Sequence, residues 1–115
     1  MTKIIYGNYG GRYYFEASGH AIAQDVIDTC GCDEEESGAV CAAVSILVQA
    51  VCARLSEMES NGELIHLGSE LQSGYACFDV TPRESSDGAV NEIFELLMAG
   101  LSLLEENYPD LVCCD

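Results

Sequence analysis

The sequence predicts an α+β domain, a two-layer sandwich of ββαββα order in which two helices lie on one face of an antiparallel-type sheet. Two observations carry this prediction. Short segments rich in β-branched and aromatic residues occur in pairs, and each pair is followed by a long segment with apolar residues at helical spacing. Such elements bury their apolar faces by packing in two layers around one core. No linker divides the 115 residues, so residues 1–115 are expected to form one domain.

The first strand pair is predicted at residues 3–8 and 12–17, with a hairpin turn at "YGG" between them. Periodicity then disappears over residues 18–37. This segment is interpreted as a long loop, with one short helical turn near residues 23–28. A loop of this length in a small domain is usually functional or disordered.

The first helix is predicted from Ser37 or Gly38 to Glu57, with Ser37 as its N-cap. Its apolar residues at helical spacing are Val40, Val44, Leu47, Val48, Val51 and Leu55.

"SNG" ends this helix, and a second strand pair follows at residues 63–68 and 75–80. In the later strand, apolar residues alternate with Tyr75, Cys77 and Asp79, so one face is predicted to be apolar. The second helix is predicted at residues 89–107, closed by Pro109.

The charge balance limits the classes of partner. Twenty acidic residues against four basic ones give a net charge of −16 at pH 7, which disfavours direct binding to nucleic acid or to an anionic membrane. A basic protein or peptide would suit this surface, although acidic surfaces also serve solubility alone. No apolar stretch reaches about 18 residues without polar interruption, so no membrane span is expected. Residues 1–15 lack the features of a signal peptide, and a cytoplasmic protein is expected.

The seven cysteines do not suggest a disulfide framework, because their number is odd and no export signal is seen. Neither Cys30-Gly31-Cys32 nor Cys113-Cys114 has the two-residue gap common in structural zinc sites, and no metal or cofactor is expected. A metal or redox site built from Cys30, Cys32 and Cys41 remains an alternative. Cys52 and Cys77 are interpreted as core residues.

Cys41 is the candidate nucleophile. It is predicted in the first turn of a helix, where unpaired N–H groups and the helix dipole stabilise a thiolate. Ser45 lies one turn later, where its hydroxyl could bond a thiolate or a substrate, or the carbonyl one turn back. His20 follows Ser18-Gly19 at the end of a strand, and a cysteine activated by a histidine is typical of acyl transfer. Cys41 could equally be a small core residue, a metal ligand or half of a disulfide.

Two motifs resemble the ribosomal-processing cysteine protease family, Prp: "ASGHA" at 17–21 and "VCAAVSILVQAV" at 40–51. The resemblance follows the order of elements along the whole chain. It implies a cysteine endopeptidase with Cys41 as nucleophile, His20 as general base and acid, and Ser45 as a supporting residue. It also implies that the substrate is a basic protein of the large ribosomal subunit, cut at its N-terminal extension, and that the enzyme is a homodimer.

The chain departs from the family pattern in two places. The 21 positions between His20 and Cys41 are more than the family has, and they include "CGCDEEE". The family usually has an aspartate three residues before the cysteine, where this chain has Gly38. Asp25, Asp28 or Asp33 could orient the imidazole, and the residues alone do not select one. These departures favour a second interpretation, a non-catalytic member retained as a binding or regulatory module.

Overall fold

The structure, a computed structural model, describes residues 2–19, 35–72 and 74–114, without the side chains of residues 35–38. Along the chain the elements are β1 (Thr2–Tyr9), β2 (Arg12–Ser18), α2 (Glu35–Ser60), β3 (Leu64–Gln72), β4 (Tyr75–Pro82), the 3₁₀ turn η1 (Glu84–Ser86), α3 (Asp87–Asn107) and β5 (Val112–Cys114).

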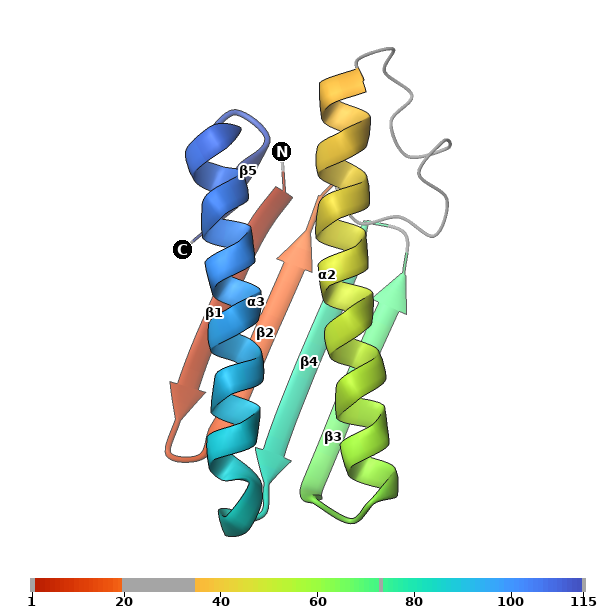
Figure 1. Ribbon diagram of the computed structural model, residues 1–115, viewed down its shortest axis with the longest axis vertical. Helices are drawn as coiled ribbons and strands as arrows, with labels where there is room; N and C mark the ends of the chain where they lie inside the picture. Colours follow the sequence, from red (N-terminus) through yellow and green to blue (C-terminus); the bar gives the residue numbers. More distant parts are fainter. Residues whose placement is uncertain (1, 20–34, 73, 115) are drawn as a thin grey trace.

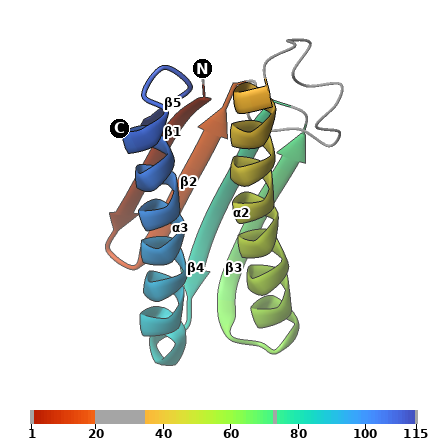
Figure 2. The ribbon, with the colours of Figure 1, turned by 45° about the horizontal axis from the view of Figure 1, so that its top comes forward.

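The strands form one sheet in the order β3-β4-β2-β1-β5. Neighbouring strands are antiparallel except β1 and β5, which are parallel. Helices α2 and α3 lie side by side on one face of this sheet and run in opposite directions (Figures 1 and 2). The predicted α+β class is therefore confirmed, while the predicted order lacks the fifth strand. Three residues are too few to show an alternating pattern in the sequence.

The β1–β2 turn shows how local sequence sets the register of the sheet. Gly10 and Gly11 have φ of 61° and 88°, and residues with a side chain rarely adopt two such values in succession. This two-residue turn pairs Tyr9 with Arg12 and, further along, Ile4 with Ala17. Side chains two apart in a strand share a face, so the same register turns Ile4 and Ala17 toward the helices.

The core lies between the sheet and the two helices. Phe94 of α3 stacks on Tyr6 and Tyr13, with ring centroids 5.4 and 5.6 Å apart, and Phe15 stacks on Phe78. The expected apolar face of β4 is confirmed, because its inward residues Ala76, Phe78 and Val80 are fully buried.

Several predicted boundaries are corrected. Helix α2 begins at Glu35, so Ser37 lies inside the helix and is not its N-cap. Strand β3 extends to Gln72, and α3 begins at Asp87. The expected helical turn at 23–28 lies outside the described residues.

Helix α2 is unusually apolar on all sides. By length and composition, its segment Ala39–Ser60 is long and apolar enough to cross a membrane, contrary to the expectation from the sequence. The core helix of a soluble protein meets the same criterion, and the inner face of α2 packs against the sheet through Val44, Val48 and Leu55.

Candidate active site

Cys41 lies in the second turn of α2 and is buried, with 3% of its surface exposed. It belongs to the apolar core, together with its neighbours Val40 and Val44. Cys41 therefore faces the core of the sandwich. The burial of Cys41 is compatible with two roles: a residue that only packs in the core, or a nucleophile that is covered when no substrate is bound.

Ser45 lies one turn after Cys41 and is also buried, with 5% of its surface exposed. Residues four apart in a helix lie on the same face, so Ser45 and Cys41 are neighbours along α2. The helix thus presents a hydroxyl and a thiol to the same side, within a layer that is otherwise apolar.

The start of α2 at Glu35 changes the electrostatic argument for Cys41. Only the first four N–H groups of a helix lack a partner within it, and Cys41 is already the seventh residue of α2. The N–H of Cys41 is used inside the helix, bonding the carbonyl of Ser37. Because the dipole effect falls off after the first turn, helix-end stabilisation of a Cys41 thiolate is weaker than the sequence suggested.

The residue that follows β2, Gly19, is held by a backbone hydrogen bond. The N–H of Gly19 donates to the carbonyl of Gly74 in the β3–β4 turn, at 2.9 Å. Gly19 and Gly74 have φ of 123° and 82°, which favour glycine at both positions. The end of β2 and the start of α2 lie at the same end of the sandwich (Figure 1).

This arrangement brings residues 17–19, the described part of the first motif, and the start of α2 to one end of the sandwich. His20 itself lies outside the described residues, but it follows Gly19 directly in the sequence. The chain segment that precedes His20 and the helix that carries Cys41 thus share one end of the sheet. Asp25, Asp28, Asp33, Cys30 and Cys32 also lie outside the described residues.

A metal centre finds no support in the described part of the chain. Within residues 2–19, 35–72 and 74–114, no three His, Cys, Asp or Glu side chains gather closely enough to hold a metal ion. Cys41 is buried among apolar residues there, which is a poor environment for a cation.

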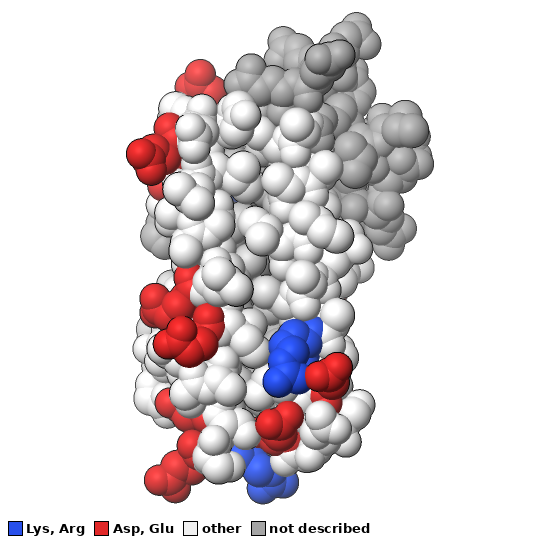
Figure 3. Space-filling view, viewed as in Figure 1, with Lys and Arg blue, Asp and Glu red and all other residues white. Residues whose placement is uncertain are grey.

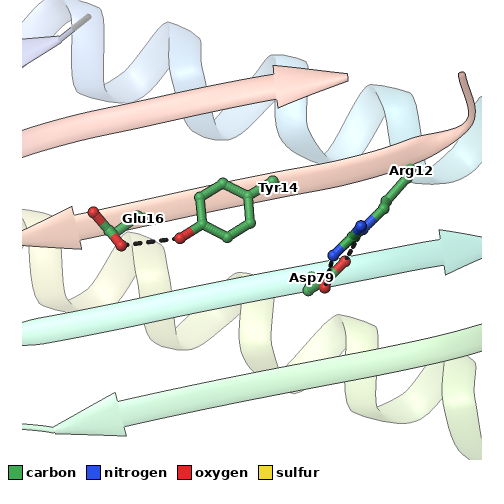
Figure 4. A network of polar contacts seen from close by, with 4 residues as sticks. All are labelled: Arg12, Tyr14, Glu16 and Asp79. Carbon is green, nitrogen blue, oxygen red and sulfur yellow. Dashed lines mark hydrogen bonds and ion pairs between the residues drawn. The ribbon is translucent and has the colours of Figure 1, made fainter. Parts of the chain in front are cut away.

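The uncovered face of the sheet carries a polar network (Figure 4). Arg12 donates two hydrogen bonds to Asp79, at 2.8 and 2.5 Å, and holds the pKa of Asp79 below its usual value. The hydroxyls of Tyr14 and Tyr75 both donate to one oxygen of Glu16, at 2.9 and 3.2 Å. These side chains point away from the helices and are not part of the candidate active site.

Cys77 belongs to this outer face, because it pairs with Glu16 across β2 and β4. Its interpretation as a core residue is therefore wrong. Its hydrogen bonding raises the pKa of Tyr75 to about 12 and contributes to the raised pKa of Tyr14, for which Glu16 is the larger cause. The alternation of Tyr75, Cys77 and Asp79 with buried residues was the available signal for this placement.

Comparison with known proteins identifies the family. The sequence profile described as "Cysteine protease Prp" matches residues 1–113, almost the full chain. No curated protein sequence gives a match.

Solved structures share the fold. The chain is similar to SMU.848 from Streptococcus mutans, with 23% identity and a TM-score of 0.66, covering 100% of this chain and 92% of that one. It is also similar to the essential ribosomal processing protease Prp from S. aureus, at 14% identity, 100% coverage of this chain and 98% of that one. The TM-scores are 0.67 for that protein with a substrate peptide and 0.61 with a covalently linked product peptide. The profile match over nearly the whole length, on a fold shared with these structures, shows that this chain belongs to the cysteine protease Prp family.

Proposed function

We propose that this protein is a cysteine endopeptidase with Cys41 as nucleophile and His20 as general base and acid. The observation that carries the proposal is the family match combined with the position of Cys41 and Ser45 on α2. The S. aureus relative has been seen with a substrate peptide and with a covalently linked product peptide, which supports peptide cleavage here. Gly19, anchored to Gly74, precedes His20 at the same end of the sheet.

The chemistry follows the usual course of a thiol protease. The Cys41 Sγ attacks the peptide carbonyl carbon, and its proton passes to His20. His20 then gives this proton to the leaving amine as the C–N bond breaks, and a thioester remains on Cys41. Water, deprotonated by His20, attacks the thioester and releases the acid and the free thiol.

The developing oxyanion requires hydrogen-bond donors that are not already used. The amide of Cys41 is committed within α2, so N–H groups of the first helical turn, residues 35–38, are the better candidates. Ser45 supports the site from the next turn. Its hydroxyl is close enough along the helix to act on the orientation of the thiol rather than on the scissile bond.

The proposed substrate is a basic protein of the large ribosomal subunit, cut at its N-terminal extension. The net charge of −16 favours encounter with a lysine- and arginine-rich chain, since opposite charges raise association rates. The proposal includes a cytoplasmic location and a homodimer.

The test is cleavage of a peptide that spans the junction between such an extension and the mature protein. Cys41→Ala should lower kcat/KM by at least about 1,000-fold, because it removes the nucleophile. His20→Ala should lower it by at least about 100-fold. Cys52→Ala is the matched control, because Cys52 lies on the same helix and should leave the rate unchanged. Cleavage by Cys41→Ala at the parent rate would refute the mechanism.

A non-catalytic binding module is the second candidate, and the burial of Cys41 and the presence of Gly38 favour it. Alkylation by iodoacetamide at neutral pH separates the two. By exposure alone Cys41 should react more slowly than Cys52 and Cys77, which are half-buried. Faster alkylation of Cys41 would thus demonstrate activation, whereas the order of exposure would support the binding module.

A further inference from the structure

The sheet has one long exposed edge. In the strand order β3-β4-β2-β1-β5, the two edge strands are β5, with three residues, and β3, with nine. Within the described part of the chain, β3 pairs only with β4, so the N–H and C=O groups on its other side face outward. Soluble proteins usually protect such an edge with proline, lysine or a bulge. β3 contains no proline or lysine, and its one irregularity lies at its start, between Leu64 and His66.

The helix layer leaves the second half of this strand open. Ser69 and Leu71 lie opposite Phe78 and Ala76 of β4, so these four side chains point toward the helix side. Phe78 and Ala76 are fully buried, whereas Ser69 is exposed and Leu71 is 37% exposed. Leu64, at the start of β3, is only 6% exposed. The cover that α2 gives to β3 therefore ends partway along the strand, and we call residues 67–72 the β3 ledge.

The β3 ledge lies at the end of the sandwich that carries the candidate active site. β3 runs toward the end at which α2 begins (Figures 1 and 2). The turn that follows β3 contains Gly74, whose carbonyl accepts the hydrogen bond from Gly19. A chain segment laid along the ledge would thus lead toward the start of α2, where Cys41 lies in the second turn.

The outer side of the ledge is acidic. Glu70 lies opposite Cys77 of β4, which in turn lies opposite Glu16 of β2, so two carboxylates stand in one row across the outer face. None of the four Lys and Arg residues lies on β3 or β4. On the helix side, the visible Lys and Arg atoms lie toward the end of the molecule opposite the start of α2 (Figure 3).

Charge decides which kind of strand fits the ledge. Cross-strand neighbours on one face interact, and like charges directly opposite each other destabilise the pair. Glu70 and the net charge of −16 disfavour pairing of β3 with β3 of a second copy. A basic extended chain would instead place Lys or Arg beside Glu70 on the outer face. At the alternate positions it would place apolar side chains beside Leu71 on the helix side.

The helix layer offers a less suitable surface for such a chain. A groove of about 190 Å³ lies between α2 and α3 and is lined mainly by apolar side chains, with Arg54 among them. A lysine- or arginine-rich segment would meet a like charge at this groove. The backbone groups within a helix are also already paired, so they leave an extended chain nothing to bond.

We propose that the β3 ledge binds an extended segment of the basic substrate as an additional antiparallel strand, with Lys or Arg at every second position. Antiparallel addition is the more stable pairing, and it runs the bound segment away from the start of α2. The segment on the ledge is then the part of the substrate that follows the scissile bond. Assigning the bound chain as a substrate rests on the proposed peptidase activity, whereas strand addition itself does not.

Fluorescence anisotropy with a labelled, N-acetylated octapeptide of alternating lysine and valine tests strand addition. An octapeptide of alternating glutamate and valine is the charge control and should bind at least about 10-fold more weakly. In an alternating peptide, the residues that bond to β3 are all of one type, either lysine or valine. N-methylation of the amides of that type should weaken binding at least about 10-fold, and N-methylation of the other type should leave it unchanged.

Variants locate the bound peptide on the ledge. Glu70→Lys should weaken binding of the lysine–valine peptide at least about 5-fold. Glu106→Lys, on the exposed side of α3, makes the same change in net charge and is the matched control. Leu71→Thr should weaken binding about 3-fold, and Ile65→Thr, near the start of the same strand, should not. Circular dichroism verifies that every variant is folded.

Three outcomes would overturn the proposal: no binding of the lysine–valine peptide, equal binding of the two N-methylated peptides, or equal binding by Glu70→Lys and Glu106→Lys. The ledge and the peptidase also fail separately. An unchanged kcat/KM of Glu70→Lys for the junction peptide would refute the ledge and leave the peptidase standing. A chain that binds the lysine–valine peptide along β3 but cleaves no junction peptide would refute the peptidase and support strand addition.

Discussion

Gly19 and Gly74 are joined by a backbone hydrogen bond of 2.9 Å, and both adopt a positive φ. The bond ties the end of β2 to the β3–β4 turn, one residue before His20. A Cβ on Gly74 would lie 3.5 Å from the Gly19 carbonyl oxygen, an ordinary van der Waals contact, so the positive φ and not a lack of space favours glycine at this position. The position from which the chain departs toward His20 is thus set by two glycines that are 55 residues apart in the sequence.

Gly74→Ala should lower the stability of the fold by about 1–2 kcal/mol, because alanine is strained at a φ of 82°. It should also lower kcat/KM about 10-fold or more. His20, the proposed general base, follows Gly19 directly, so a shift of the Gly19 backbone would displace the imidazole. Gly62→Ala is the control. Gly62 has a φ of 76° and no atom within 4 Å of an added Cβ, so it should lose similar stability and keep its activity. Equal activity in both variants would contradict this role.

Cys41→Ala should cost about 1 kcal/mol of unfolding free energy, because it removes a buried sulfur from the core between α2 and the sheet. Urea unfolding of the Cys41→Ala and Cys52→Ala variants measures the loss of unfolding free energy in each. The loss should be smaller for Cys52→Ala, because Cys52 is only half-buried. A cost at Cys41 no larger than that at Cys52 would indicate that Cys41 is not packed as described.

Asp79→Asn should reduce stability at neutral pH and leave it unchanged in acid. Arg12 lowers the pKa of Asp79 in the folded protein below its value of 3.8 in the unfolded chain. The stabilisation is therefore complete above the unfolded pKa and is lost as the pH falls through the folded pKa. Thermal unfolding from pH 7 to pH 2 should show the parent and the variant converging below pH 4.

The comparison needs a control for loss of a negative charge, and Glu106→Gln on the exposed side of α3 provides it. A gap between the parent and Asp79→Asn that persisted at pH 2 would mean that the carboxylate acts through something other than its ionised form. The expected difference is small, since exposed ion pairs contribute little net stability.

Glu16→Gln should allow Tyr14 and Tyr75 to ionise at lower pH. Both hydroxyls donate to Glu16, and the pKa of Tyr75 is raised to about 12, with Cys77 as the larger cause and Glu16 among the others. A raised tyrosine pKa stabilises the fold below pH 10, and this contribution is lost as the pH rises toward 12. Ultraviolet titration of tyrosinate should show the variant ionising earlier in alkali.

Glu92→Gln, on the helix side of the molecule, is the matched control for that titration and should leave the tyrosinate curve where it is. The Cys77→Ala variant separates the two causes for Tyr75, because it removes the thiol and keeps the carboxylate. If the curve of Glu16→Gln overlies that of the parent, the hydrogen bonds to Glu16 do not hold the tyrosine protons.

The sequence by itself determined the α+β class, the four longer strands, both helices and the family motifs at His20 and Cys41. These depend on local periodicity and on short motifs, which the linear sequence contains. Tertiary structure decided what depends on partners distant in sequence. β5 becomes a strand only because β1 offers it an edge, with Thr2 pairing with Val112.

The same reason applies to the site and to the helix surface. Cys41 is buried because it lies three residues before Val44 and seven before Val48, on the face of α2 that packs against the sheet. Gly19 meets Gly74 only when two strands pair, and the groove between α2 and α3 exists only when the helices pack together. Periodicity shows which face of an element is apolar, while the packed chain decides which apolar faces remain uncovered.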